Sequence, residues 1–317
     1  MQNNFLFSSI AMGILLRGYF MIADHFNIID KPNQRSSHTI PVIRGGGVIF
    51  LFGILLWFFQ NSFQLPWFVL ACAIIAIISF IDDVSSLPAR VRFPIQLFSV
   101  LLLFYQLTPQ WPIYFLIVAV IMCVGTINAF NFMDGINGIT GVYALVTLCT
   151  FLYIDESMIK FSDSNLLTIE ILSVLIFLFF NFRKRARCFA GDVGSVTIAL
   201  ILIFVLLQLI QTTNNFLWPL VFLVYGTDSI ITIICRLKRK ENIFKPHRTH
   251  LYQYLSNEYK IPHLVVSTGY GIMQGVINLI LIYSFSKHDY KSPIVISVIY
   301  IIGYLLLRIK LVSRLKS

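Results

Sequence analysis

The sequence is poor in charged residues, and in acidic ones above all. Only 12% of its 317 residues are charged, with 14 Asp and Glu against 24 Lys and Arg, whereas a soluble domain carries roughly 25%. Hydrophobic residues make up 57% and form long runs that a soluble core of buried strands cannot easily accommodate. The composition therefore predicts an all-α, polytopic membrane protein with helices of about twenty residues.

Metal-binding and redox cysteine motifs are also missing. The five cysteines show no CxxC spacing and four of them lie in apolar runs, so we expect packing residues rather than disulfides or metal ligands. No internal repeat, low-complexity segment or signal peptide is apparent, and the first apolar run, near 5–23, is expected to be a retained helix. We predict a single integral membrane domain over residues 1–317.

The apolar runs predict a bundle of eleven membrane-spanning helices, or ten if the short run at 94–107 stays at the interface. An odd number of spans places the two termini on opposite sides of the membrane. The candidate spans lie near 5–23, 45–60, 66–81, 94–107, 111–127, 138–154, 166–182, 195–210, 216–235, 262–285 and 292–308.

Basic residues gather in alternate loops. Twenty of the 24 Lys and Arg lie in the C-terminal tail and in four loops near 24–44, 82–93, 183–194 and 236–261. The positive-inside rule places these loops, the 126–137 loop and the C-terminus in the cytoplasm, and the N-terminus in the periplasm. The net charge of +10 then follows from topology and favours anionic lipid headgroups. We predict no nucleic-acid partner, because no groove-reading motif accompanies the charge.

A polar island at residues 128–139 interrupts the apolar pattern. It holds Asn128, Asn131, Asp134 and Asn137 together with two glycines, between two apolar runs. Hydrocarbon cannot solvate amides and a carboxylate, so polar groups at a membrane boundary usually face protein, water or a ligand. The island predicts a backbone turn around something polar.

Adjacent carboxylates, Asp82 and Asp83, end the third apolar run. Two neighbouring negative charges repel each other, and a cation relieves that repulsion. Mg²⁺ commonly takes one or two carboxylates together with phosphate oxygens of a substrate. The alternative is a helix end whose Asp residues are solvated by the headgroup region.

Asp192 lies in the run Gly191–Ser195, directly before another apolar segment. Glycines let a backbone curl so that its amides face an anion, and a helix N-terminus adds a favourable dipole. The alternative reading makes Ser195 a helix N-cap, with Asp192 supporting the first turn.

The largest basic loop contains His247, Arg248 and His250. Arg and His suit phosphate binding through charge-assisted hydrogen bonds, and zinc is disfavoured because no third or fourth ligand lies near. The alternative is a solvated basic loop. Asp228, inside an apolar run, is expected to pair with a cytoplasmic-side Arg or His, and both a structural ion pair and a catalytic role stay open for it. Lys31 is a candidate phosphate contact.

These motifs resemble the polyprenyl-phosphate N-acetylhexosamine-1-phosphate transferases (glycosyltransferase family 4). That family includes the enzymes that start O-antigen and enterobacterial common antigen chains, and the phospho-MurNAc-pentapeptide translocase of peptidoglycan synthesis. The resemblance spans nearly the whole chain and rests on ordered motifs: Asp30–Asn33, Arg35–His38, Arg44–Gly47, Asp82-Asp83, Asn128–Ile139, Gly191–Ser195 and His247–Gln253.

The resemblance implies a reaction in which a lipid phosphate attacks the sugar-bearing phosphorus of a UDP-N-acetylhexosamine and UMP leaves. Partners would be undecaprenyl phosphate, the UDP-sugar and the bilayer of the bacterial inner membrane, with the site facing the cytoplasm and a homodimer left open. The implied cofactor is Mg²⁺, with Mn²⁺ as a substitute.

Family roles can be carried onto this chain residue by residue. Asp82, Asp83 and Asp134 resemble the catalytic carboxylates, and Asp192, with Asp83, resembles the metal ligands. The residues implied in substrate binding are Lys31, Arg44, Asn128, Asn131, Asn137, His247, Arg248 and His250.

Two departures narrow the resemblance. Asn137 stands where many members carry a second Asp, which puts an ionised role there in doubt, and the run from His247 lacks the three consecutive histidines of the peptidoglycan enzyme. The O-antigen branch, with GlcNAc or a 6-deoxy sugar such as FucNAc or QuiNAc, is therefore preferred over the peptidoglycan translocase. A membrane transporter or lipid flippase is the alternative of another class, although such proteins place polar sites near the midplane.

Overall fold

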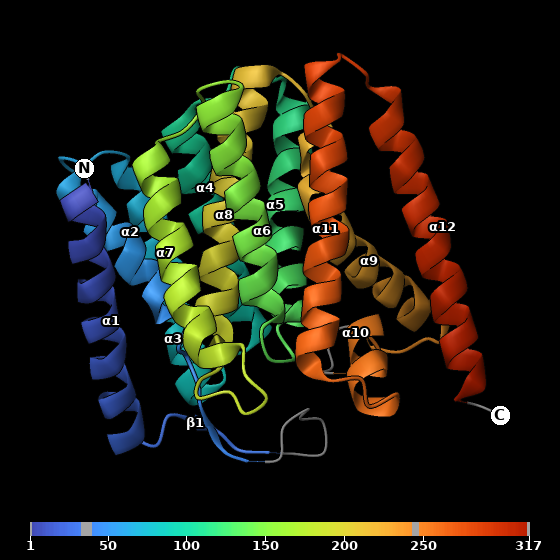
Figure 1. The fold of residues 1–317 in the computed structure, drawn as a ribbon, viewed down its shortest axis with the longest axis horizontal. Coiled ribbons are helices and arrows are strands. Elements are labelled where there is room, and N and C mark those ends of the chain that lie inside the picture. Colours follow the sequence, from blue (N-terminus) through green and yellow to red (C-terminus); the bar gives the residue numbers. More distant parts are fainter. Residues whose placement is uncertain (1, 33–39, 243–246, 316–317) are drawn as a thin grey trace.

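The computed structural model describes residues 2–32, 40–242 and 247–315, and these form an almost wholly helical bundle (Figure 1). The long helices are α1 (Gln2–His25), α2 (Val48–Gln60), α3 (Pro66–Ser85), α4 (Ala89–Leu107), α5 (Ile113–Met133), α6 (Ile139–Ser157), α7 (Ser164–Asn181), α8 (Gly191–Thr213), α9 (Leu223–Lys238), α11 (His263–Ser286) and α12 (Lys291–Arg314). The short elements are β1 (Ile29–Asp30), β2 (Val42–Ile43), the 3-10 helix η1 (Trp218–Phe222), α10 (Leu251–Gln253) and the π-helical turn η2 (Tyr254–Glu258).

A helix occupies each of the predicted span positions. In the described parts of the chain, nine helices are long and apolar enough to cross a membrane, and α2 is apolar but has only 13 residues. The all-α membrane fold is thus confirmed, and the chain is a multi-pass membrane protein. The N-terminal end of α1 and the C-terminal end of α12 lie at opposite ends of the bundle (Figure 1), as an odd number of crossings requires. The number of spans and the side of each terminus stay predictions.

The central helix of the bundle is α8. Its side chains are apolar around the whole circumference and 94% of its most apolar stretch is buried, as expected for a helix surrounded by others. It packs against α2, α3, α5 and α6, and Phe204 stacks on Phe68 of α3 with ring centroids 4.0 Å apart. Because α8 is surrounded by other helices, the position of its N-terminus is fixed.

The approach between α2 and α8 depends on glycine. A Cβ atom added at Gly47 would lie 2.2 Å from the Cα atom of Gly194, so any side chain at Gly47 would force the helices apart. The amides of Gly46 and Gly47 donate to the carbonyls of Phe189 and Ala190 at 2.8 and 3.1 Å. The triglycine segment, Gly45–Gly47, is therefore hydrogen-bonded to the residues that lead into α8.

A two-stranded antiparallel sheet completes this end of the bundle. In β1 and β2, Ile29 pairs with Ile43 and Asp30 pairs with Val42, and Ile43 also bridges to Cys188. The sheet fixes the chain on both sides of the undescribed residues 33–39. It leads β2 into Arg44, directly beside the first turn of α8.

Candidate functional site

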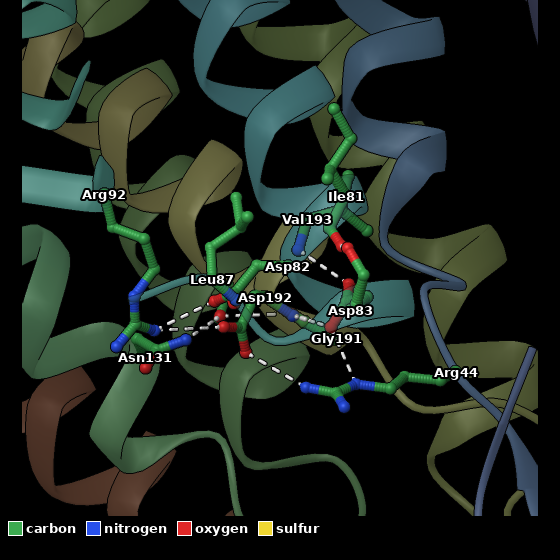
Figure 2. Close-up of polar contacts among 12 residues, drawn as sticks. Arg44, Ile81, Asp82, Asp83, Leu87, Arg92, Asn131, Gly191, Asp192 and Val193 are labelled. Carbon is green, nitrogen blue, oxygen red and sulfur yellow. Dashed lines mark hydrogen bonds and ion pairs between the residues drawn. The ribbon is translucent and has the colours of Figure 1, made fainter. Parts of the chain in front are cut away.

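Three carboxylates from two distant parts of the sequence meet at one end of the bundle (Figure 2). Asp82 and Asp83 lie in the last turn of α3, and Asp192 lies in the first turn of α8. Arg44, which follows β2, and Arg92, in the first turn of α4, are salt-bridged to them. The packing of α3 against α8 brings these charges together across more than a hundred residues of sequence.

Asp83 fastens the N-terminus of α8 to α3. One of its oxygens accepts the Asp192 amide at 2.8 Å, the other accepts the Val193 amide at 3.0 Å, and Arg44 Nε donates to the first at 2.7 Å. The first amides of a helix have no partner within it and favour a negative charge. The amides expected to face an anion therefore face Asp83, whose side chain is 0% exposed.

Glycine is required where these segments touch. Gly191 has φ of +72°, and a Cβ atom there would lie 2.4 Å from Asp83 Oδ2. A side chain would therefore be strained and would push Asp83 away from the amides of α8. Ser195 is not the N-cap, which is Ala190; its hydroxyl donates to the Gly191 carbonyl at 3.1 Å.

Asp82 and Asp192 share one positive partner. Arg92 Nη1 lies 2.9 Å from Asp82 Oδ2 and 3.5 Å from Asp192 Oδ2. Arg44 Nη2 lies 3.5 Å from the other oxygen of Asp192, and the Leu87 amide donates to Asp82. Their side chains are 6% and 20% exposed, so Asp192 is the most accessible of the three carboxylates.

The arrangement of Asp82 and Asp192 suits Mg²⁺, although the site holds few protein ligands. Within residues 2–32, 40–242 and 247–315, no group of three or more His, Cys, Asp or Glu side chains is arranged to hold a metal. Mg²⁺ commonly takes only one or two carboxylates and completes its shell with water and phosphate oxygens. Asp82 and Asp192 already converge on one positive charge, so they fit that smaller donor set.

The polar island forms the end of α5 and the turn into α6. The Asn131 amide donates to Ser195 Oγ of α8 at 3.3 Å, and the Asn128 amide donates to Gln96 Oε1 of α4 at 2.8 Å. Asp82, Arg92, Asn128, Asn131 and Asp192 line one small cavity. The structure therefore places both asparagines beside the carboxylates.

Asp134 lies just beyond α5, where Thr140 Oγ1 donates to it at 2.7 Å. Burial raises the pKa of Asp134 to about 6, although the Thr140 hydrogen bond and Arg44 oppose the shift. Asp134 is therefore a carboxylate that changes charge near neutral pH.

Asn137 forms its hydrogen bonds outside the carboxylate cluster. Its side-chain amide donates to the Arg183 carbonyl at 2.7 Å, and its own carbonyl accepts from Ser267 at 2.8 Å. The residue is 5% exposed and joins α6, α11 and the loop after α7. This geometry favours a structural role over the predicted substrate contact.

The buried carboxylate of Asp228 holds the loop between α9 and α10, here called the C-terminal loop. His250 Nδ1 donates to Asp228 at 3.1 Å, and Arg308 Nη1 of α12 lies 3.8 Å from the same residue. This confirms the expectation that Asp228 pairs with a His or an Arg. Asp228 also accepts hydrogen bonds from the Leu251 amide and from the hydroxyls of Thr232, Tyr270 and Tyr304.

The same loop packs against the polar island. The Tyr252 hydroxyl donates to the Phe132 carbonyl at 3.0 Å, and the His250 and His247 rings stack with centroids 4.9 Å apart. His250 Nε2 is buried and has no hydrogen-bond partner among the described residues, which calls for a ligand or water there.

Residues 247–250 are not helical, because α10 begins at Leu251. Burial lowers the pKa of His247 to about 4, and the nearby His250 and arginines add to the shift. His247 is therefore neutral near pH 7.

The remaining predicted substrate contacts lie in loops. Arg248 follows His247 in its loop, and Lys31 is exposed directly after β1. The predicted motif at 35–38 lies outside the described residues.

Sequence reasoning missed two arginines of this region. Arg92 was counted only among topological charges, and Arg308 only as part of the basic tail. Arg92 stands in the run Arg92-Phe93-Pro94-Ile95-Gln96, which gives no local signal of a binding site. Arg308, by contrast, interrupts an apolar helix at 5% exposure, and an intramembrane charge is itself a signal.

The segment that carries the three carboxylates is similar to known proteins. Residues 65–210, from the start of α3 to near the end of α8, match glycosyl transferase family 4. The chain is 28% identical over 257 residues to a Bacillus subtilis (strain 168) protein named "Probable undecaprenyl-phosphate N-acetylglucosaminyl 1-phosphate transferase", with 74% of this chain and 71% of the relative covered.

Two further relatives have related names. The "Undecaprenyl-phosphate alpha-N-acetylglucosaminyl 1-phosphate transferase" of Escherichia coli (strain K12) is 25% identical, with 82% of this chain and 75% of the relative covered. The "Decaprenyl-phosphate N-acetylglucosaminephosphotransferase" of Mycobacterium leprae (strain TN) is 23% identical, with 74% and 71% covered. The matched segment carries Asp82, Asp83 and Asp192. The chain is therefore similar to the polyprenyl-phosphate N-acetylhexosamine-1-phosphate transferases, and these matches support the family that its ordered motifs indicate.

Proposed function

We propose that this protein transfers N-acetylhexosamine 1-phosphate from a UDP-sugar to undecaprenyl phosphate and releases UMP. The observation that carries the proposal is the convergence of Asp82 and Asp192 on the Arg92 guanidinium at the ends of two membrane-length helices. The names of the relatives supply the substrate class. An acidic cluster at a helix end that is paired with arginines suits a reaction between a lipid phosphate and a nucleotide diphosphate.

The bond changes balance without a redox partner. An oxygen of the lipid phosphate forms a bond to the sugar-bearing phosphorus, and the bond from that phosphorus to the bridging oxygen breaks. The bridging oxygen leaves on UMP. Phosphoryl transfer depends mainly on positioning and on neutralising charge on the phosphate oxygens, and lipid phosphate is already anionic near neutral pH. The protein therefore needs counter-charges more than a strong base.

The residues divide these tasks. Mg²⁺, with Mn²⁺ as a substitute, would be held by Asp82 and Asp192 and would act as a Lewis acid and template at the phosphate oxygens. Asp83 would hold α8 in place, because its oxygens already accept two α8 amides and Arg44. Arg44 would neutralise the cluster and contact phosphate.

The polar island and the C-terminal loop would bind the nucleotide sugar. Asn131 directly precedes Phe132, whose carbonyl accepts the Tyr252 hydroxyl, and Asp134 follows two residues after Phe132. Neutral His247 would accept hydrogen bonds from hydroxyl groups, and Arg248 would donate to diphosphate. His250 has a buried nitrogen that needs a partner.

We further infer that the site faces the cytoplasm of a bacterial inner membrane, because UDP-sugars are the donors and the basic loops lie at this end. GlcNAc is the first sugar to test, followed by FucNAc and QuiNAc. The reaction would be the first membrane step of O-antigen or a related glycan.

A panel of UDP-sugars tests the proposal. Purified protein with Mg²⁺ and undecaprenyl phosphate should release UMP with at least one UDP-N-acetylhexosamine, whereas Asp192→Asn should release at least about 100-fold less, since a transition-state charge loses its counter-ion. The donor of peptidoglycan synthesis, UDP-MurNAc-pentapeptide, should be inactive. Absence of UMP with every donor, in protein that unfolds cooperatively, would refute the proposal.

A further inference from the structure

The two arginines of the site are held differently. Arg44 is fixed at several points, because its Nε is 2.7 Å from buried Asp83 and its carbonyl accepts the Tyr19 hydroxyl. The Arg92 guanidinium contacts only Asp82 and Asp192 among the described residues, and its side chain is 39% exposed. Arg92 is therefore the arginine that can leave.

Charge balance favours its departure when a dication binds. Three carboxylates and two guanidinium groups give the cluster a net charge of about −1 at neutral pH. A dication held by Asp82 and Asp192, with both arginines in place, would reverse that sign. It would also lie within a few ångströms of the Arg92 guanidinium, which contacts the same two oxygens. At such distances like charges repel strongly, so the dication and Arg92 compete for one position.

A partner for the released arginine would come from the cavity that Arg92 lines. Beside Arg92, the polar lining of this small cavity comprises Ser79, Asp82, Gln96, Asn128, Asn131 and Asp192, and the apolar lining comprises Ile75, Ile78, Ile95 and Val196. A guanidinium beside an apolar surface matches an anionic headgroup joined to a hydrocarbon chain. Arg also binds phosphate through two parallel N–H bonds.

We propose that Arg92 exchanges partners during the reaction. Before a dication binds, Arg92 neutralises Asp82 and Asp192; once the dication binds, the released guanidinium binds the phosphate of the lipid acceptor. This inference rests on the proposed function and adds an order to it, in which the metal prepares the site for the lipid phosphate. It also gives the two arginines different roles, since Arg44 keeps its contact with Asp83 while Arg92 changes partner.

Opposite effects of one substitution on two ligands test this exchange. Calorimetric titration with Mg²⁺ alone should show about tenfold tighter binding to Arg92→Gln than to the wild type, because a competing charge-assisted contact is gone. Arg90→Gln is the matched control: Arg90 lies in the same first turn of α4, is exposed and contacts none of the three carboxylates. Its Mg²⁺ affinity should equal that of the wild type.

The second titration uses undecaprenyl phosphate in nanodiscs at saturating Mg²⁺, without nucleotide. Arg92→Gln should bind it about tenfold more weakly, Arg92→Lys should recover part of the loss, and Arg90→Gln should be unchanged. Unchanged or weaker Mg²⁺ binding by Arg92→Gln would overturn the exchange, as would unchanged lipid-phosphate binding or a loss confined to UDP-sugar. If Arg92→Gln does not fold, Arg92→Lys decides by the same two titrations, with smaller changes of the same sign. Neither titration depends on turnover, so a failure of the proposed reaction is seen separately, as absence of UMP in the wild type.

Discussion

Replacing Asp83 by Asn should destabilise the fold more than replacing either neighbouring carboxylate. Asp83 accepts two amides of α8 and the Arg44 guanidinium, and its side chain is fully buried. Asn offers one oxygen in place of two and turns an NH₂ group toward donors. At least one charge-assisted hydrogen bond, of about 1.5–3 kcal/mol, is therefore lost and a donor left without a partner. Because Arg44 is partly exposed, we expect a loss of roughly 2–4 kcal/mol in total.

Thermal unfolding in detergent without Mg²⁺ measures this difference. A loss of that size should lower the unfolding midpoint by roughly 5–10 °C. Asp192→Asn should leave the midpoint within about 2 °C of the wild type, since its contacts with both arginines are long and partly exposed. An unchanged midpoint for Asp83→Asn, together with lost Mg²⁺ affinity, would refute the reasoning and make Asp83 a metal ligand rather than the anchor of α8.

Further predictions concern the packing, the loop and the pH dependence. Gly47→Ala should cost about 3 kcal/mol, because its Cβ would lie 2.2 Å from a backbone atom of α8, whereas Gly13→Ala, with nothing within 4 Å, should unfold at the wild-type temperature. Asp228→Asn should lower kcat/KM about 100-fold by misplacing His250, with the Mg²⁺ affinity unchanged in calorimetry; wild-type turnover would contradict this. Burial raises the pKa of Asp134 to about 6, so kcat/KM should fall as the pH drops through about 6 and the carboxylate gains a proton. Asp134→Asn should lack this acid limb, and a variant that keeps it would assign the limb to another group.

The helices could be predicted because their signal is local. Apolar runs of membrane length specify the helices from their own residues, and each predicted span coincides with a helix. The place of Asp192 in the first turn of an apolar helix was readable in the same way. The pairing of Asp228 followed from a general argument, that an intramembrane carboxylate needs a partner.

The pairings within the site could not be predicted because they are not local. The amides at the start of α8 were expected to face a bound anion, yet they bind Asp83 of α3. Arg92 belongs to the site only because α3, α4 and α8 pack together. Asn137 lies within the polar island but bonds to the Arg183 carbonyl. Sequence spacing places residues on an element, whereas the crossing of elements decides which charges meet.

The fate of one phosphorus atom tests the central claim most directly. Protein with Mg²⁺, undecaprenyl phosphate and a UDP-N-acetylhexosamine labelled with ³²P at the sugar-bearing phosphate is extracted into lipid and aqueous fractions. Transfer of sugar 1-phosphate predicts that the label enters the lipid fraction in step with unlabelled UMP in water. Label that stays in the aqueous fraction as UDP, while sugar reaches the lipid, would mean that the glycosidic bond breaks instead and would contradict the account.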